Sequence, residues 1–282
     1  NSAFPAKTDE IRRIVEAGAV GFKLYLLQQL GGVNIDDDQA LLNTFRAIKR
    51  TEVPIAVHAE DKKILEAKRR EMEKAGRKDP EAYLKAHPPE AEAQAIRRIT
   101  PLARRSGIQV HFCHVSSAIG LNALLKAKKA GLPITCEVTP HHLLLSLKHL
   151  KRYGTLALAD PPLRTTEDVA ALWNALKQGS IDAIASDHAP HTIEEKEVES
   201  VWDAKPGIPG LETTLPLLLT QVNDGRLTLA DLVKLTSEKP AEIFNLKNRG
   251  GLEEGNWADI VVVDVNRKYK FDSSKFYSKA KY

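Results

Sequence analysis

Four ionisable residues of this sequence each lie in or just after a short apolar run: Lys23, His58, His114 and Asp187. Two imidazoles and a carboxylate are a ligand set suited to zinc, because neutral histidine supplies nitrogen donors and aspartate compensates the charge. A protonated lysine repels a cation, so Lys23 becomes a ligand only if its amine reacts with carbon dioxide to give a carbamate. That carbamate could bridge two metal ions.

Each of these residues has a plainer explanation when it is taken alone. A lysine in an apolar run is often an edge-strand residue with its charged end in water. A histidine after such a run is more often a hydrogen-bonded core residue than a ligand, and Asp187 could simply cap a turn. Four coincidences at matching positions favour one shared site, provided that the fold brings those positions together.

Short β-prone runs alternate with helical patterns along most of the chain. The predicted strands are residues 21–26, 54–58, 109–115, 134–138, 156–159 and 181–186. This alternation predicts parallel βαβ units and an α/β fold. Six such strands indicate a TIM-like (β/α)8 barrel that lacks its first two strands. In a barrel of this kind, residues at the C-terminal ends of the strands meet at one mouth.

The rest of the chain departs from this rhythm. Residues 192–209 are rich in Glu, Lys and Pro and are predicted to form a long loop after the last barrel strand. Residues 257–265 are predicted to form a strand outside the barrel. We therefore expect a catalytic barrel over residues 1–245, with part of a small β-sandwich appendage and the C-terminal tail over residues 246–282.

Composition narrows the classes of function. The net charge is only +4, and the basic clusters are flanked by acidic residues, which is typical of solvated helix faces rather than a nucleic-acid surface. The apolar runs fall short of the roughly 20 residues that a membrane helix needs. The two cysteines, Cys113 and Cys136, lie in apolar stretches and indicate no disulfide framework. We expect a cytoplasmic protein that binds neither nucleic acid nor membrane.

An ordered set of motifs resembles the dihydroorotase branch of the amidohydrolase superfamily. The likeness extends from about Ala17 to Ser278-Lys-Ala-Lys and rests on six motifs: Gly-Phe-Lys-Leu-Tyr-Leu, His58-Ala-Glu, Cys113-His-Val-Ser, Thr135-Cys-Glu-Val-Thr-Pro-His-His, Asp187-His-Ala-Pro-His and Pro209-Gly-Leu-Glu-Thr. Each motif is weak alone, and the order of the set makes it specific.

The resemblance implies a site with two zinc ions bridged by carboxylated Lys23. His58 and His114 would bind the second zinc, and Asp187 would bind the first and act as general base and then acid. The implied substrate contacts are Asp160, His191, Pro206 and Gly207. The implied reaction is the reversible cyclisation of N-carbamoyl-L-aspartate to dihydroorotate, on the route to pyrimidines, by a homodimer.

Two features depart from the family pattern. Dihydroorotases begin with a His-x-His pair on the first strand, and none of the nine histidines here forms such a pair. We therefore expect a piece that lacks its N-terminal segment and is not fully active alone. Asp160 stands where many relatives have Asn, and a second anion there would repel an anionic substrate unless it is paired, for instance with Arg164.

Several other polar residues are lesser candidates. Cys113 and Glu137 could approach the metals, although packing explains a buried thiol more simply. The pair His141-His142 supports the site or makes a turn after Pro140. His87 and His149 lie in charged surroundings and are predicted to be exposed.

Three alternative functions stay open. A hydantoinase or allantoinase would use the same ligands on another ring. A catalytically inactive relative would keep the barrel as a scaffold for aspartate transcarbamoylase, which the missing His-x-His pair favours and the intact Lys23, His58, His114 and Asp187 oppose. An unrelated barrel aldolase would use Lys23 as an uncharged Schiff-base amine.

Overall fold

A single parallel sheet forms the centre of the computed structural model, which describes residues 2–3 and 8–282. Its strands are β1 (Phe22–Tyr25), β2 (Ile55–His58), β3 (Val110–Phe112), β4 (Ile134–Val138) and β5 (Ala183–Ile184). Each strand pairs in parallel with the next one along the chain, for example Tyr25 opposite His58. The predicted α/β class with parallel βαβ units is therefore confirmed.

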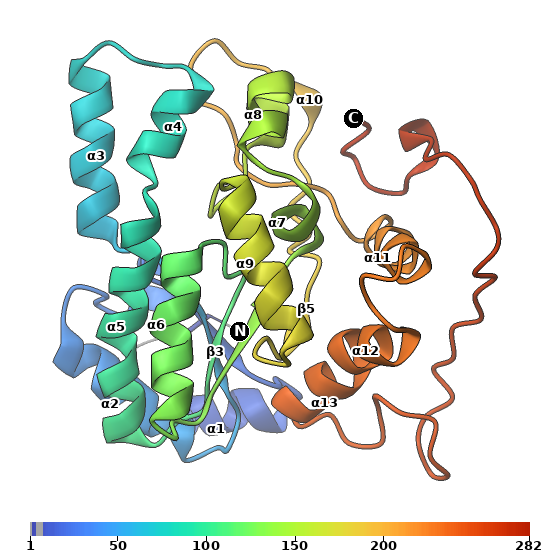
Figure 1. Ribbon diagram of the computed structural model, residues 1–282. Coiled ribbons are helices and arrows are strands. Elements are labelled where there is room, and N and C mark those ends of the chain that lie inside the picture. The colour runs from blue at the N-terminus through green and yellow to red at the C-terminus, as the bar shows by residue number, and fades with distance from the viewer. Residues whose placement is uncertain (1, 4–7) are drawn as a thin grey trace.

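Helices fill the connections between the strands and continue after them. They are α1 (Thr8–Glu16), α2 (Asp38–Lys49), α3 (Lys62–Lys74), α4 (Pro80–Ala86), α5 (Pro89–Ser106), α6 (Ala118–Lys129), α7 (Pro140–Leu144), α8 (Leu147–Tyr153), α9 (Thr166–Lys177), α10 (Ile193–Lys196), α11 (Thr214–Asn223), α12 (Leu229–Val233) and α13 (Lys239–Ile243). Shorter turns are η1 (Leu30–Gly32), η2 (Gly154–Ala157), the π-helical η3 (Lys234–Glu238) and η4 (Ser273–Lys275). Neighbouring helices α2, α5, α6 and α9 pack side by side in that order, as in successive units of a (β/α)8 barrel (Figure 1).

The two faces of the sheet differ in polarity because side chains alternate along a strand. One face is apolar and packs among the helices in the main hydrophobic core, with Phe22, Leu24, Ile55, Val57, Val110, Phe112, Ile134 and Cys136. By this alternation the other face carries Lys23, Tyr25, His58, His111 and Glu137. A polar face opposite the helical layer is the place where chemistry can be built.

Helix caps fix two of the turns that follow the strands. The Asp61 side chain accepts a hydrogen bond from the Ile64 backbone N–H at 3.0 Å and begins α3. Ser117 accepts one from the Gly120 N–H at 3.1 Å and begins α6. Each cap comes three residues after a candidate ligand, His58 or His114. The helix start therefore determines where the chain leaves each strand.

The predicted strand at residues 156–159 is wrong. Residues Gly154–Ala157 form the 3-10 turn η2, and Leu158 bonds outside the sheet. Its carbonyl accepts hydrogen bonds from the Gly207 N–H at 2.8 Å and from Lys196 Nζ at 3.0 Å. The apolar character of this run reflects burial in a second, smaller core rather than strand pairing.

The predicted strand at residues 257–265 is also wrong. The segment is extended but has no strand assignment, and Val262 is 92% exposed. A strand requires a neighbouring strand for its backbone hydrogen bonds, and the described residues form no β-ladder with this run, in which only the Trp257 and Val265 backbones bond to other segments. The division at residue 245 stays a prediction. Among the residues that the structure describes, no helix has the length and apolar character needed to cross a bilayer.

Candidate active site

The four predicted ligands come together on the polar face and C-terminal edge of the sheet. Lys23 lies within β1, His58 is the last residue of β2, His114 follows β3 and Asp187 follows β5. Their charges interact: Lys23 and His58 both affect the pKa of Asp187, and both also affect the pKa of His114. The strand order therefore assembles residues that are far apart in the sequence, while their roles as ligands stay predictions.

The two histidines form the most closely spaced part of the site. His58 Nδ1 lies 3.0 Å from His114 Nε2, and both side chains are almost completely buried. The other ring nitrogen of His58, Nε2, lies 3.0 Å from a carboxylate oxygen of Glu60. Because a carboxylate can only accept, Glu60 holds the proton on Nε2 and leaves the Nδ1 lone pair directed at His114.

Two of the four residues have an unusual backbone conformation. His114 has φ 38° and Asp187 has φ 43°, in the left-handed region that residues with a Cβ rarely adopt. Such a conformation costs on the order of 1 kcal/mol and persists only where the surrounding structure enforces it. His114 lies two residues after the end of β3 and Asp187 three residues after the end of β5, so both strained residues lie in turns at the C-terminal edge of the sheet.

Lys23 lies beside the Cys113 thiol. Its Nζ donates a hydrogen bond to Cys113 Sγ at 2.9 Å and lies 5.0 Å from the centre of the Tyr25 ring. Burial acts to lower the pKa of Lys23, but Cys113, Tyr25 and Glu137 outweigh it and the pKa is raised. Burial also raises the pKa of the Cys113 thiol to about 12. Cys113 thus approaches the site as a neutral neighbour of Lys23.

Partial burial raises the pKa of Asp187, and the nearby Glu137 carboxylate adds to that shift, while Lys23 opposes it. Glu137 is held in turn by His111, whose Nε2 lies 2.9 Å from a carboxylate oxygen of Glu137. A carboxylate with a raised pKa is a stronger base than an ordinary aspartate. Asp187 is therefore suited to accept and return a proton.

The donor set suits a divalent cation. Two nitrogens on one tetrahedral zinc, each about 2.0 Å from it, lie about 3.3 Å apart, which is close to the separation of His58 Nδ1 and His114 Nε2. Burial holds the pKa of His114 well below the usual range, so the ring is neutral, and its Nδ1 atom is buried without a hydrogen-bond partner. Lys23 fits such a centre only as the carbamate, since the ammonium would repel the cation.

A second polar cluster adjoins His58. Glu60 Oε1 lies 3.4 Å from His87 Nδ1, which lies 3.7 Å from Asp160 Oδ1, and the Tyr83 hydroxyl donates a hydrogen bond to Asp160. The prediction that His87 is exposed is wrong, since 13% of its side chain is accessible. Glu60 and Tyr83 were not predicted. The His58-Ala-Glu spacing could have indicated Glu60, because both residues follow one strand end.

Arg164 does not form the expected pair with Asp160. Its Nε donates to Ser116 Oγ at 3.1 Å and its Nη1 to the His87 carbonyl at 2.5 Å. His149, also predicted to be exposed, is half-buried, and its Nδ1 accepts a hydrogen bond from the Ser146 N–H at 3.0 Å at the start of α8. Hydrogen-bond partners distant in sequence explain the buried position of His87.

His142 supports the chain near Asp160. Its Nε2 donates to the Pro161 carbonyl at 3.0 Å and its Nδ1 accepts from Thr139 Oγ1 at 2.8 Å. Burial lowers the pKa of His142 to about 4, so the ring is neutral near pH 7. His141 is buried as well, and its Nε2 has no hydrogen-bond partner.

The predicted substrate residues of the 192–209 loop region contact each other. His191 Nε2 donates to the Pro206 carbonyl at 3.1 Å, and the Gly207 N–H is bonded to Leu158. Gly207 has φ 145°, and a Cβ there would lie 2.5 Å from the Ala189 carbonyl oxygen, so only glycine fits. The loop contains α10, whose buried Lys196 donates to the carbonyls of Leu158 and Gly207 at 3.0 and 2.8 Å.

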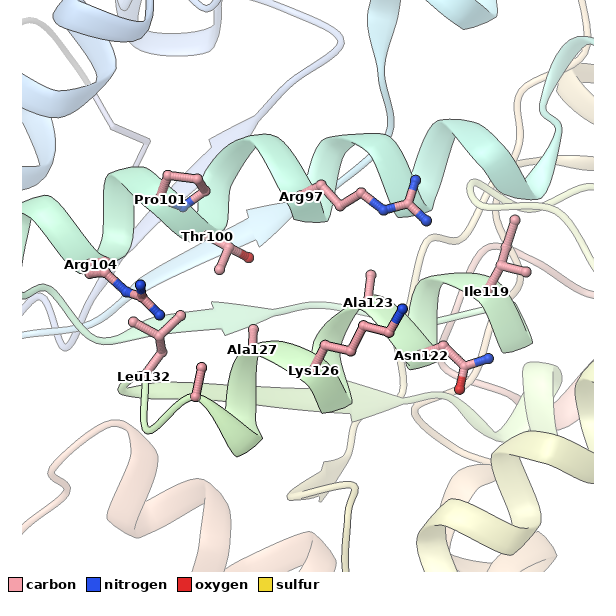
Figure 2. Close-up of a pocket in the computed structure, with 11 residues that line it drawn as sticks. Arg97, Thr100, Pro101, Arg104, Ile119, Asn122, Ala123, Lys126, Ala127 and Leu132 are labelled. Carbon is pink, nitrogen blue, oxygen red and sulfur yellow. The ribbon is translucent and has the colours of Figure 1, made fainter.

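A separate groove lies between α5 and α6, away from all of these residues. It has a volume of about 550 Å³ and is lined by helix-surface side chains that include Arg97, Arg104, Ile119 and Lys126 (Figure 2). It contains none of the candidate ligands or bases. The groove is therefore not part of the candidate site on the polar face of the sheet.

Comparison with known proteins gives one family. The profile of the amidohydrolase family matches residues 30–281. The L-hydantoinase of Paenarthrobacter aurescens is 36% identical over 283 residues, which are 99% of this chain and 62% of that protein. The dihydroorotase of Methanosphaera stadtmanae is 40% identical over 240 residues, which are 84% of this chain and 55% of that protein. The chain thus spans about three fifths of the length of these relatives.

Solved structures agree with the sequence comparison. The L-hydantoinase (dihydropyrimidinase) from Arthrobacter aurescens superposes with a TM-score of 0.94 at 36% identity and covers 100% of this chain and 64% of its own. The D-hydantoinase from a Thermus species superposes with a TM-score of 0.83 at 30% identity, and the match covers 89% of this chain and 56% of that protein. The barrel arrangement inferred from the alternation of strands and helices is shared with these structures.

Proposed function

Because this chain belongs to the amidohydrolase family, we propose that the complete protein is a metal-dependent cyclic amidohydrolase whose reaction interconverts N-carbamoyl-L-aspartate and dihydroorotate. The observation that supports this most is the convergence of Lys23, His58, His114 and Asp187 at one edge of the sheet. A scaffold protein without activity would have no need to hold His114 and Asp187 in strained conformations.

Two zinc ions fit this proposal. His58 and His114 would hold one ion, Asp187 the other, and carboxylated Lys23 would bridge them. When bound, such a centre lowers the pKa of water from about 15.7 towards 7 and polarises the carbonyl of the substrate ring. Glu60 maintains the tautomer of His58 that this arrangement requires.

Asp187 moves the proton in the proposed reaction. Its carboxylate, made more basic by partial burial, takes a proton from the attacking water. The new carbon–oxygen bond forms as the ring carbon–nitrogen bond breaks, and Asp187 returns the proton to the leaving nitrogen. In the reverse direction the same carboxylate removes the proton from the ureido nitrogen as the ring closes.

The substrate would lie between this centre and the loop that contains α10. His191 would meet the substrate carboxylate, with Pro206, Gly207 and Asp160 beside the ring. The hydrogen bonds of Gly207 and Lys196 to Leu158 support this loop, so its position is set by buried backbone contacts. Cytoplasmic location, a homodimer and association with aspartate transcarbamoylase stay predictions.

A hydantoinase is the second candidate. It is favoured by the TM-score of 0.94 and by the full coverage of this chain in the superposition on the L-hydantoinase from Arthrobacter aurescens. The two candidate substrates differ in charge, because dihydroorotate has a ring carboxylate and hydantoin has none. Two predicted contacts would respond to that difference: His191, which would meet the carboxylate, and Asp160, an anion beside the ring.

A substrate panel tests the proposal. The complete protein, loaded with zinc, is assayed with dihydroorotate, N-carbamoyl-L-aspartate, hydantoin and allantoin. We expect the protein to open the ring of dihydroorotate and to cyclise N-carbamoyl-L-aspartate. Both reactions should depend on Asp187. Turnover of hydantoin without dihydroorotate would replace the proposal by the second candidate, and a zinc-loaded protein inactive on all four would contradict both.

A further inference from the structure

The polar cluster beside His58 contains two carboxylates, those of Glu60 and Asp160, and the histidine His87. Glu60 is completely inaccessible, and the side chain of Asp160 is 29% exposed. Two carboxylates in one partly buried cluster repel each other and need a positive charge between them. His87 is the group that lies between them, 3.4 Å from Glu60 and 3.7 Å from Asp160.

We propose that His87 is a specificity residue: held as an imidazolium between Glu60 and Asp160, it neutralises Asp160 so that a ring bearing a carboxylate can bind beside it. This inference rests on the proposed function, in which Asp160 contacts the ring. It answers the question of what pairs with Asp160, since Arg164, the partner expected from the sequence, bonds to Ser116 and to the His87 carbonyl instead. Buried Lys196 also interacts with the charge of Asp160, but its amine donates to the carbonyls of Leu158 and Gly207.

The surroundings of His87 favour its charged form. Burial acts to lower the pKa of His87, but the carboxylates of Glu60 and Asp160 outweigh it, and the pKa is raised despite the opposing charge of Arg164. The Tyr83 ring stacks on the imidazole with centroids 4.3 Å apart, and its hydroxyl bonds to Asp160. The same tyrosine therefore orients both members of the pair.

The cluster also faces the reacting groups. Glu60 lies 3.0 Å from His58 and 3.4 Å from His87, which lies 3.7 Å from Asp160, so the cluster adjoins the candidate site through Glu60. A carboxylate placed there without its counter-charge would act on any anion in the site. A neutral ring would experience little of this effect, so His87 acts on the choice of substrate rather than on the chemical step.

Two rings that differ by one carboxylate group provide the test. Dihydrouracil is dihydroorotate without its carboxylate, and both are given to the complete zinc-loaded protein and to its variants. In His87→Gln, we expect KM for dihydroorotate to rise about tenfold while kcat changes less, because the charge of Asp160 is no longer offset. For dihydrouracil, KM or the inhibition constant should change less than about twofold, because a neutral ring is little affected by the charge of Asp160.

Removing both charges is the decisive comparison. Asp160→Asn in the His87→Gln background should restore most of the affinity for dihydroorotate, since the anion that needed a counter-charge is gone. His149→Gln, which removes another half-buried histidine, serves as the control and should leave the ratio of the two constants unchanged. Equal losses for both rings, or no recovery in the double variant, would overturn the proposal.

Two further measurements keep this inference distinct from the proposed function. Carbon-13 histidine NMR should show that the pKa of His87 falls on Asp160→Asn, whether or not any ring is turned over. Failure of dihydroorotate turnover in the parent protein would contradict the proposed function alone. Metal analysis should give the same zinc content for the parent and His87→Gln; loss of one ion would show that a metal, rather than the imidazolium, joins Glu60, His87 and Asp160.

Discussion

His58 Nδ1 and His114 Nε2 face each other at 3.0 Å, although 56 positions separate them in the sequence. Burial keeps the pKa of His114 well below the usual range, so two imidazolium ions do not meet at this point. Glu60 orients His58 from its far side. The fold thus holds these two ring nitrogens side by side, with the His58 Nδ1 lone pair directed at His114 Nε2.

Lys23→Ala should remove bound zinc and most activity from the complete protein. The variant lacks the amine that would carry the bridging carbamate, and a small carboxylate such as acetate should restore part of both. Metal content and turnover are the measurements, with Lys129→Ala on the exposed end of α6 as the control. In a crystal structure of the metal-loaded parent, Lys23 Nζ should have the added carboxylate, and an unmodified Lys23 would contradict the assignment.

Asp187→Asn should preserve the fold and lower turnover by about 10²- to 10⁴-fold, the range for loss of a positioned acid–base group. The amide keeps the shape of the side chain but cannot take up the proton. Turnover and thermal unfolding are measured together, and exposed Asp203→Asn is the matched control. Turnover near that of the parent would remove Asp187 from its assigned role.

Glu60→Gln should weaken zinc binding by about 10- to 100-fold, as is usual when the carboxylate behind a histidine ligand is lost. The amide no longer forces the proton onto His58 Nε2, so the Nδ1 lone pair is less available. Zinc affinity is measured by competition with a chelator. The control is Glu66→Gln, whose side chain is 49% exposed on α3. Equal affinity in the parent and Glu60→Gln would show that this contact does not orient the ligand.

Lys196 gives the chain a stability that depends on pH. Burial lowers its pKa to about 8 in the folded protein, whereas an unfolded lysine titrates near 10.4. Between these values the unfolded chain binds more protons, so the free energy of unfolding rises with pH from about 8 to 10.4. The stabilisation is fully present above that range and is lost as the pH falls through 8. The uncharged amine still has two N–H groups for Leu158 and Gly207.

The Lys196 prediction is measured as a difference between two proteins. Urea unfolding of the parent and of Lys196→Met is followed from pH 7 to 10, which cancels other groups that titrate in this range. The parent should gain stability relative to the variant as the pH rises, by at most about 3 kcal/mol for a shift of this size. A constant difference across the range would mean that Lys196 keeps its ordinary pKa.

The strands, and the positions of the candidate ligands at their ends, were predictable from local sequence pattern. In the segments that form β1 to β5, apolar residues alternate with polar ones or occur in short runs, which is enough to identify the strands. Lys23, His58 and His114 are recognisable as candidates because they lie in or just after those segments. Parallel pairing then brings the ends together without further information. The polar face of the sheet follows from the same alternation.

Features that depend on distant partners were not predictable in this way. The run at residues 156–159 resembles a strand, but Leu158 bonds to Lys196 and Gly207, which lie far along the chain. His87 is surrounded by charged sequence, yet its partners Glu60 and Asp160 bury it from two other segments. At residues 257–265, β propensity is present but no described neighbour completes the ladder.

The left-handed backbone at His114 and Asp187 sets a limit on how this protein can be engineered. Glycine adopts this conformation without the steric cost of a Cβ, so His114→Gly or Asp187→Gly would relieve local strain while deleting a side chain of the site. A directed-evolution screen that selects for heat resistance alone should therefore favour glycine at these two positions, and the proposed activity would be lost. Selection for thermal robustness has to be coupled to turnover for this scaffold to improve.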